Sequence, residues 1–161
     1  MKKLSVLLLG CLLNTAAVFA AEPHYFENVV AVVKLQKGLT LLEKDGVANE
    51  LEKLGFTDVM WNIEDADYTA VFSSSVTWEQ AMAIKGVEKV GIRFSMTLKS
   101  PADLEEQNLN SLKALGLVPV EVMKKMKTVS AVVYDPTSLE KIKNHSSVQS
   151  LTLGETAVGS L

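Results

Sequence analysis

Residues 87–97, Val-Glu-Lys-Val-Gly-Ile-Arg-Phe-Ser-Met-Thr, decide the fold because two strand patterns follow each other there with a single glycine between them. Val87 to Val90 reads as a short strand, and from Ile92 to Thr97 apolar side chains alternate with polar ones. This alternation is typical of a strand with one buried face. No linker rich in proline or glycine separates the two patterns, so we expect the segments on either side to be tightly coupled.

The sequences before and after this stretch resemble each other when they are shifted by 61 residues without a gap. Turns, helix starts and apolar phases coincide at this offset, which indicates an internal duplication. The first repeat covers 29–90 and the second covers 91–153. Identical pairs include Asn49/Asn110, Leu51/Leu112, Leu54/Leu115, Gly55/Gly116, Val59/Val120, Ala70/Ala131, Val71/Val132, Glu79/Glu140 and Val87/Val148.

The first repeat predicts the order strand, helix, strand, strand, helix, strand. Thr40 and Glu43 have the spacing of a capping box at the start of its first helix, and Gly55 is placed to end that helix. A hairpin should turn at Glu64–Ala66, and Gly86 should end the second helix. The expected strands are 29–35, 56–63, 67–72 and 87–90, and the expected second helix is 77–85.

The second repeat follows the same plan. Ser100 should cap its first helix, with Pro101 at the first helical position and Leu104, Leu112 and Leu115 on the apolar side. Strands are expected at 92–97, 117–123, 129–134 and 148–153, and a short helix after Asp135-Pro136. This order is the ferredoxin-like plan. The sequence therefore predicts an α+β fold of tandem ferredoxin-like (βαββαβ) units, with antiparallel sheets, helices on one face and the other face uncovered.

The two ends of the chain have their own patterns. Lys2 and Lys3 precede an apolar run and then small residues, which predicts a signal peptide over 1–20, cut after Ala20 or Ala21, and export to the periplasm or beyond. A lipoprotein at Cys11 and an uncleaved anchor are the alternatives. Residues 21–28 then form an N-terminal extension and 154–161 a C-terminal tail. We expect no membrane span once the signal is removed.

The composition argues against several functions. The net charge is −3 and Arg93 is the one arginine, which disfavours nucleic-acid binding. Cys11 as the single cysteine excludes an intramolecular disulfide and a thiolate zinc cluster. His24 and His145 are expected at the surface, and no phosphate-binding loop or HExxH motif is present. We therefore expect no enzyme activity, no cofactor and no metal.

Three further groups have alternative interpretations. Glu64, Asp65 and Asp67 are expected to form a solvated turn, with calcium binding as the alternative. Trp61 and Trp78 are expected to pack in the core, with a sugar or ligand platform as the alternative. Lys124–Lys127 is expected to keep a hairpin tip or sheet edge soluble, as charges at sheet edges commonly do, with contact to an acidic partner as the alternative.

Residues 129–142, Val-Ser-Ala-Val-Val-Tyr-Asp-Pro-Thr-Ser-Leu-Glu-Lys-Ile, are followed by His-Ser-Ser-Val-Gln-Ser-Leu at 145–151. This pattern resembles the last strand, helix and strand of subtilisin propeptides and the related proteinase B-type inhibitors. The resemblance extends back to Ile92 and reaches the first repeat only through the duplication. It departs from the family at the central hairpin, where Lys124, Lys125 and Lys127 stand in place of an acidic residue.

The resemblance implies an inhibitor or folding chaperone that acts in trans on a subtilisin-like serine protease. Such domains dock through the uncovered sheet face and lay their C-terminal tail in the substrate cleft. The expected docking face is Glu121, Met123, Ser130, Val132 and Tyr134, and the expected cleft residues are Val158, Gly159, Ser160 and Leu161. Leu161 would fill the primary specificity pocket and Val158 an apolar pocket farther along the cleft.

Two other functions remain open at this point. A tandem ferredoxin-like module could bind a small ligand between its two sheets, or it could serve as an envelope adaptor. An inhibitor gene should lie beside the gene of its protease, so gene neighbourhood separates the first function from the other two.

Overall fold

A computed structural model describes residues 22–154 of the chain. The predicted signal peptide, Cys11 and tail residues 155–161 lie outside the described residues. The first part contains β1 (Val30–Leu35), α1 (Leu41–Leu54), β2 (Thr57–Asn62), β3 (Asp67–Val71) and α2 (Trp78–Met82). The second contains the 3-10 helix η1 (Pro101–Leu104), α3 (Glu106–Ala114), β5 (Val118–Met123), the 3-10 helix η2 (Lys124–Met126), β6 (Thr128–Val133), α4 (Thr137–Lys143) and β7 (Val148–Leu153).

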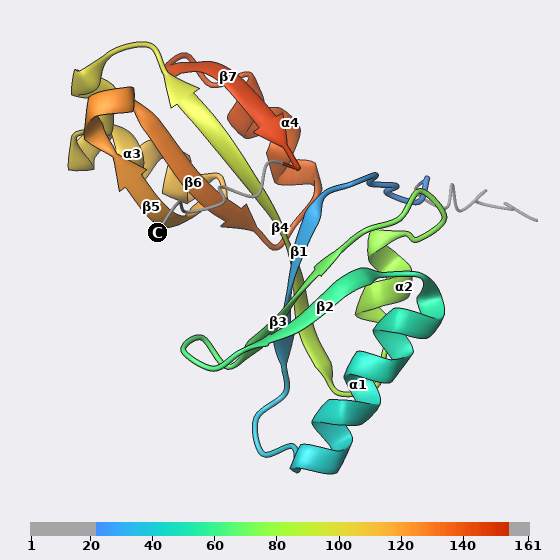
Figure 1. Ribbon diagram of the computed structural model, residues 1–161. Coiled ribbons are helices and arrows are strands. Elements are labelled where there is room, and N and C mark those ends of the chain that lie inside the picture. The colour runs from blue at the N-terminus through green and yellow to red at the C-terminus, as the bar shows by residue number, and fades with distance from the viewer. Residues whose placement is uncertain (1–21, 155–161) are drawn as a thin grey trace, which may run out of the picture.

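The strand β4 (Val87–Leu98) joins the two parts (Figure 1). It is one strand of 12 residues, where the sequence predicted two strands separated by Gly91. Glycine does not interrupt it, because the chain stays paired with β1 up to Ile92 and with β6 from Ile92 onward.

The seven strands within residues 22–154 form one antiparallel sheet in the order β2-β3-β1-β4-β6-β5, with β7 also paired to β4. The predicted α+β class and antiparallel pairing are confirmed, but the two expected sheets are a single sheet. Because Ile92 pairs with Ala31 on one side and Val133 on the other, β6 occupies one edge of β4. Strands β1 and β7 follow each other along the opposite edge.

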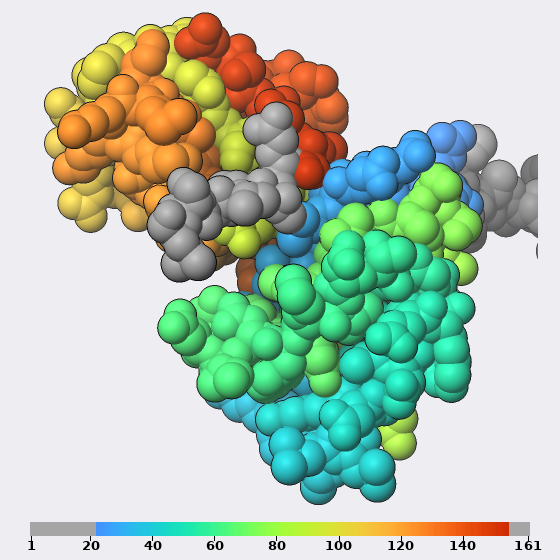
Figure 2. Space-filling view, in the orientation of Figure 1, coloured from blue at the N-terminus to red at the C-terminus, as the bar shows by residue number. Residues whose placement is uncertain are grey.

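The helices cover one face of the sheet. On β4 every second residue from Val90 to Leu98 is buried in a single core, which also contains Leu51 of α1, Leu112 of α3 and Ile142 of α4. Figure 1 shows α1 and α2 against the lower part of the sheet and α3 and α4 against the upper part. In Figure 2 the two parts form separate masses that meet at a waist.

Equivalent elements recur at the offset seen in the sequence. The first residues of β2 (Thr57–Asn62) and β5 (Val118–Met123) are 61 residues apart, and so are their last residues. The first residues of β4 and β7 are also 61 residues apart. Gly55 and Gly116 both follow a helix with positive φ, at 104° and 95°. These glycines end the helices as predicted, because this backbone region is costly for residues with a Cβ.

Local signals placed most helix starts correctly. The Thr40–Glu43 capping box is present, and Thr77 forms a second one with Gln80. The helix predicted after Ser100 is instead divided, because Glu105 is extended (φ −65°, ψ 150°) between η1 and α3. The Ser100 N–H still donates to Asp103 Oδ2 at 2.8 Å, so the capping box closes a 3-10 turn.

The N-terminal extension is attached to the first part of the fold. Tyr25 forms an isolated bridge with Thr77, and His24 Nδ1 lies 2.7 Å from Glu79 Oε1. Both tryptophans pack partly buried against the core, as predicted. The Trp78 Nε1–H donates to the Val90 carbonyl, which fixes α2 on β4.

Candidate functional site

The face of the sheet away from the helices, called here the open face, carries Val32, Lys34, Asp67, Thr69, Gly91, Arg93 and Val132. Its polar centre is a row of cross-strand neighbours. Asp67 on β3 pairs with Asn62 on β2 and with Lys34 on β1, and Lys34 pairs in turn with Lys89 on β4. Residues in register on neighbouring strands share a face, so four polar side chains cross the first half of the molecule together.

Asp67 is buried, with 4% of its surface exposed. Among the described residues its Oδ1 has no hydrogen-bond partner. Burial raises the pKa of Asp67 above the ordinary value of 3.8, the nearby Asp65 raises it further, and Lys34 opposes both. The expectation of a solvated turn is therefore wrong for Asp67. It holds for Glu64 and Asp65, which are exposed and hydrogen-bonded to Asn62.

Lys34 does not neutralise Asp67, although it stands across from it. Within the described chain the two side chains form no ion pair within 4.0 Å. The Lys34 ammonium lies 5.8 Å from the centre of the Tyr134 ring, and that of Lys89 lies 6.0 Å from the same point. Both ammonium groups therefore lie near Tyr134, at the outer limit of cation–π attraction to its ring. Burial raises the pKa of Tyr134, against the lowering effect of Lys34.

Val132 of β6 and Tyr134, which directly follows β6, belong to the second half of the chain but pack over Gly91 of β4. A Cβ at Gly91 would approach Val132 Cγ1 to 2.4 Å and Tyr134 Cε1 to 2.8 Å. Because Gly91 has no side chain, Val132 and Tyr134 can pack directly against the backbone of β4. This close approach brings the end of β6 beside the polar row.

A cavity of about 350 Å³ lies between these elements. Its volume lies in the range of small-molecule sites. Both halves of the chain contribute residues to it. Its lining residues are Val32, Lys34, Asn62, Asp65, Asp67, Thr69, Arg93, Val118, Pro119, Val120, Val132 and Tyr134.

A larger cavity, about 580 Å³, lies between α1 and α2. Its charged members, such as Glu43 and Glu50, are exposed and already bonded to Thr40 and Lys53. The open-face cavity differs because it has a buried carboxylate with an unused oxygen. No group of three or more potential metal ligands occurs in 22–154, so the calcium alternative gains no geometric support.

The predicted docking face is exposed only in part. Ser130 and Val132 are 3% and 4% exposed, so the expectation that they face solvent is wrong. Val132 is buried because it packs over Gly91, and Ser130 is a short side chain paired with Ser95 and Glu121 on the flanking strands. Tyr134 is half-buried, while Glu121 is exposed and Met123 is half-exposed.

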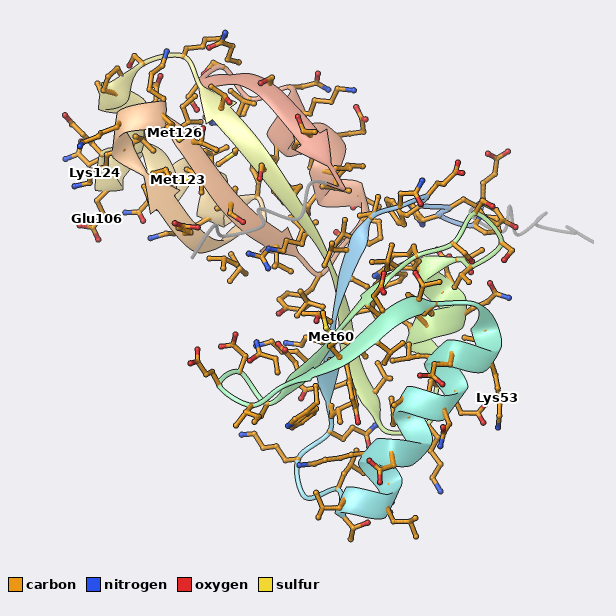
Figure 3. The ribbon with its side chains drawn as sticks, in the orientation of Figure 1. Lys53, Met60, Glu106, Met123, Lys124 and Met126 are labelled. Atoms are coloured by element: carbon orange, nitrogen blue, oxygen red, sulfur yellow. The ribbon has the colours of Figure 1, made fainter. Side chains whose placement is uncertain are left out.

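Three exposed apolar residues of this half lie on β5, an edge strand of the sheet. Val118, Val120 and Val122 are 45%, 54% and 37% exposed. Figure 3 shows Met123, Lys124 and Met126 together at the adjoining hairpin tip, where Met126 is 64% exposed. Sequence alternation alone did not indicate this edge, because a bulge between Pro119 and Glu121 shifts its register.

The predicted cleft residues Val158, Gly159, Ser160 and Leu161 lie outside the described residues. Their point of departure is defined. Gly154 has φ 88°, and a Cβ there would lie 2.5 Å from the Asn28 carbonyl oxygen. The chain therefore leaves β7 beside the start of β1, at the waist of the molecule.

Comparison with known protein families, curated proteins and solved structures finds no match to this chain. Within the described part of the chain, no helix is long and apolar enough to cross a membrane.

Proposed function

We propose that the protein is an exported inhibitor or folding chaperone of a subtilisin-like serine protease, made of two ferredoxin-like units that share β4. The observation that carries this proposal is the strand order of the second half, β7-β4-β6-β5, with α3 and α4 on one face. A βαββαβ unit of the ferredoxin-like kind has this order, with its fourth strand beside its first. The first half has the same order, β4-β1-β3-β2.

In this proposal β5 carries the main contact with the protease. Exposed valines on an edge strand favour pairing with another chain, because the strand has unused backbone donors and acceptors. Val118 and Val120 supply the apolar area, and Glu121 and Met123, from the docking face expected on sequence grounds, lie on the same strand. Ser130 and Val132 support this surface from within rather than touch the partner.

The tail adds the second contact. Seven residues beyond Gly154 span about 23 Å when extended, at ~3.3 Å each. This length lets Val158–Leu161 enter a substrate cleft while the sheet stays docked. Leu161 fills the primary pocket, and Gly159 allows close pairing with the enzyme backbone.

A chaperone role follows from the same binding. A large parallel-sheet enzyme has many non-local contacts and folds slowly. A partner that binds native-like structure stabilises it by mass action. Inhibition and assisted folding are then two consequences of one interface.

The experiment compares two exposed positions on opposite halves of the chain. Val120→Asp places a charge on the proposed β5 contact, and Leu42→Asp places one on α1, where Leu42 is 82% exposed. Inhibition of a secreted subtilisin-like protease, chosen from the gene neighbourhood, should weaken at least tenfold for Val120→Asp and less than twofold for Leu42→Asp. Equal inhibition by the two variants would contradict a β5 contact.

A further inference from the structure

We infer that the open-face cavity binds a small zwitterion, a free α-amino acid or a short peptide, with its ammonium group at Asp67 and its carboxylate at Arg93 and Lys34. This inference goes beyond the proposed protease function and does not depend on it. It rests on three observations: an unpartnered buried carboxylate, two cations in the same cavity, and an apolar wall beside them.

Asp67 supplies the first observation. Buried polar atoms are almost always hydrogen-bonded, and a buried charge without a partner is costly. Asp67 Oδ1 has no partner among the described residues, and the cationic neighbour Lys34 is drawn to Tyr134 instead. A ligand that donates a hydrogen bond to Asp67 Oδ1 would explain a buried carboxylate at this strand position.

Arg93 and Lys34 supply the second observation. Both line the cavity, and within residues 22–154 neither forms an ion pair within 4.0 Å. A guanidinium group binds a carboxylate through two parallel hydrogen bonds. A ligand with only a negative charge would face Asp65 and Asp67, and one with only a positive charge would face the two cations Lys34 and Arg93. A zwitterion matches both sets.

The apolar wall supplies the third observation. Val32, Val118, Val120 and Val132 lie around the cavity together with the Tyr134 ring. These side chains suit an aliphatic or aromatic ligand side chain. The volume of about 350 Å³ accommodates one amino acid or a dipeptide. Because both halves line the cavity, the bound ligand should hold them together.

The test is calorimetry on the full chain, with no protease present. The probes are L-leucine, L-phenylalanine and L-alanyl-L-leucine. We expect at least one to bind with a Kd of about 1 mM or tighter, which is measurable at ordinary protein concentrations. Tighter binding of the dipeptide identifies a peptide ligand, and tighter binding of leucine or phenylalanine identifies a free amino acid. Absence of binding for all three at 10 mM overturns the inference.

Blocked probes and matched variants assign the two charges. N-acetyl-leucine lacks the ammonium and leucinamide lacks the carboxylate, so each should bind at least tenfold more weakly than leucine. Asp67→Asn and Arg93→Gln should each weaken the affinity for leucine at least tenfold. Glu64→Gln, in the same turn as Asp67, should change that affinity less than twofold. Thermal melting of each variant confirms folding. Undiminished binding to Asp67→Asn and Arg93→Gln, or to both blocked probes, contradicts the zwitterion site.

Discussion

Lys34 and Asp67 face each other on β1 and β3, yet the Lys34 ammonium lies 5.8 Å from the centre of the Tyr134 ring rather than at the Asp67 carboxylate. A lysine of the first half is thus positioned by Tyr134, a residue of the second half. This arrangement leaves Asp67 buried without a partner for Oδ1. We therefore expect the buried Asp67 carboxylate to lower the stability of the fold.

Replacing Asp67 with Asn should stabilise the fold at pH 7. The amide keeps the shape of the side chain but removes the buried charge, and we expect a gain of about 1 kcal/mol. For a domain of this size that corresponds to roughly 3 °C in Tm. Asp65→Asn is the matched control, because Asp65 is exposed and already bonded to Asn62, and it should change stability by less than about 0.5 kcal/mol. Destabilisation by Asp67→Asn alone would show that the carboxylate has a partner in the native state.

The effect of Asp67→Asn should depend on pH. The folded-state pKa of Asp67 lies above its unfolded value, so folding favours the protonated form. The stability that this group contributes is present below the unfolded pKa and is lost as pH rises through the folded pKa. In urea unfolding, the free energies of unfolding of Asp67→Asn and of the parent chain should therefore differ least at about pH 4 and most at about pH 7. A gap that stays constant over this range would contradict the raised pKa.

Gly91 should not tolerate a methyl group without a loss of stability. Gly91→Ala forces Val132 and Tyr134 away from β4, and overpacking of this kind costs about 1–3 kcal/mol. Gly46 is the control. It lies inside α1 with nothing within 4 Å of its Cβ position, so Gly46→Ala should stabilise by about 0.5–1 kcal/mol. Chemical denaturation of the two variants measures both effects, and opposite signs are required.

The shared strand β4 should make the two halves unfold together. Leu51 and Leu112 are equivalent in the repeat and both fully buried, so Leu51→Ala and Leu112→Ala should each cost about 2–5 kcal/mol. Because one core joins the halves, either change should speed amide exchange in β3 and in β6 alike. Faster exchange confined to the mutated half would show that β4 links two independent units.

Much of the fold could be predicted because its signals are local. The capping residues Thr40 and Thr77 and the positive-φ glycines Gly55 and Gly116 act within a few residues of their own positions. Strand alternation likewise predicts that Val129, Ala131 and Val133 share one face of their strand, and all three are buried in the core. None of these features needs knowledge of a distant segment.

The site could not be predicted to the same extent, because it depends on contacts between the halves. Alternation within 67–72 places Asp67 opposite the core-facing Tyr68, but it does not indicate that Asp67 is buried. The burial of Val132 depends on the missing side chain at Gly91 and on how the sheet brings β6 over it. A glycine inside a strand pattern was the available signal, since it often marks a close approach of another segment.

The tail should matter for inhibition and not for folding. Deleting Val158–Leu161 should leave the melting temperature unchanged, because every residue of the described core precedes Gly154. Inhibition should fall at least tenfold, because two apolar anchors are lost, each worth about 1.5–3 kcal/mol when fully buried. An equally potent truncated chain would mean that the sheet alone inhibits.

The most direct test of the proposed function is a stoichiometric titration of a purified subtilisin-like protease with the full chain. Peptidase activity is followed with a small chromogenic substrate at a fixed enzyme concentration. The proposal predicts a linear loss of activity that reaches its minimum at one chain per enzyme molecule, with the chain recovered uncut. Unchanged activity at a hundredfold excess of the chain, against the protease of the gene neighbourhood and against subtilisin itself, would contradict it.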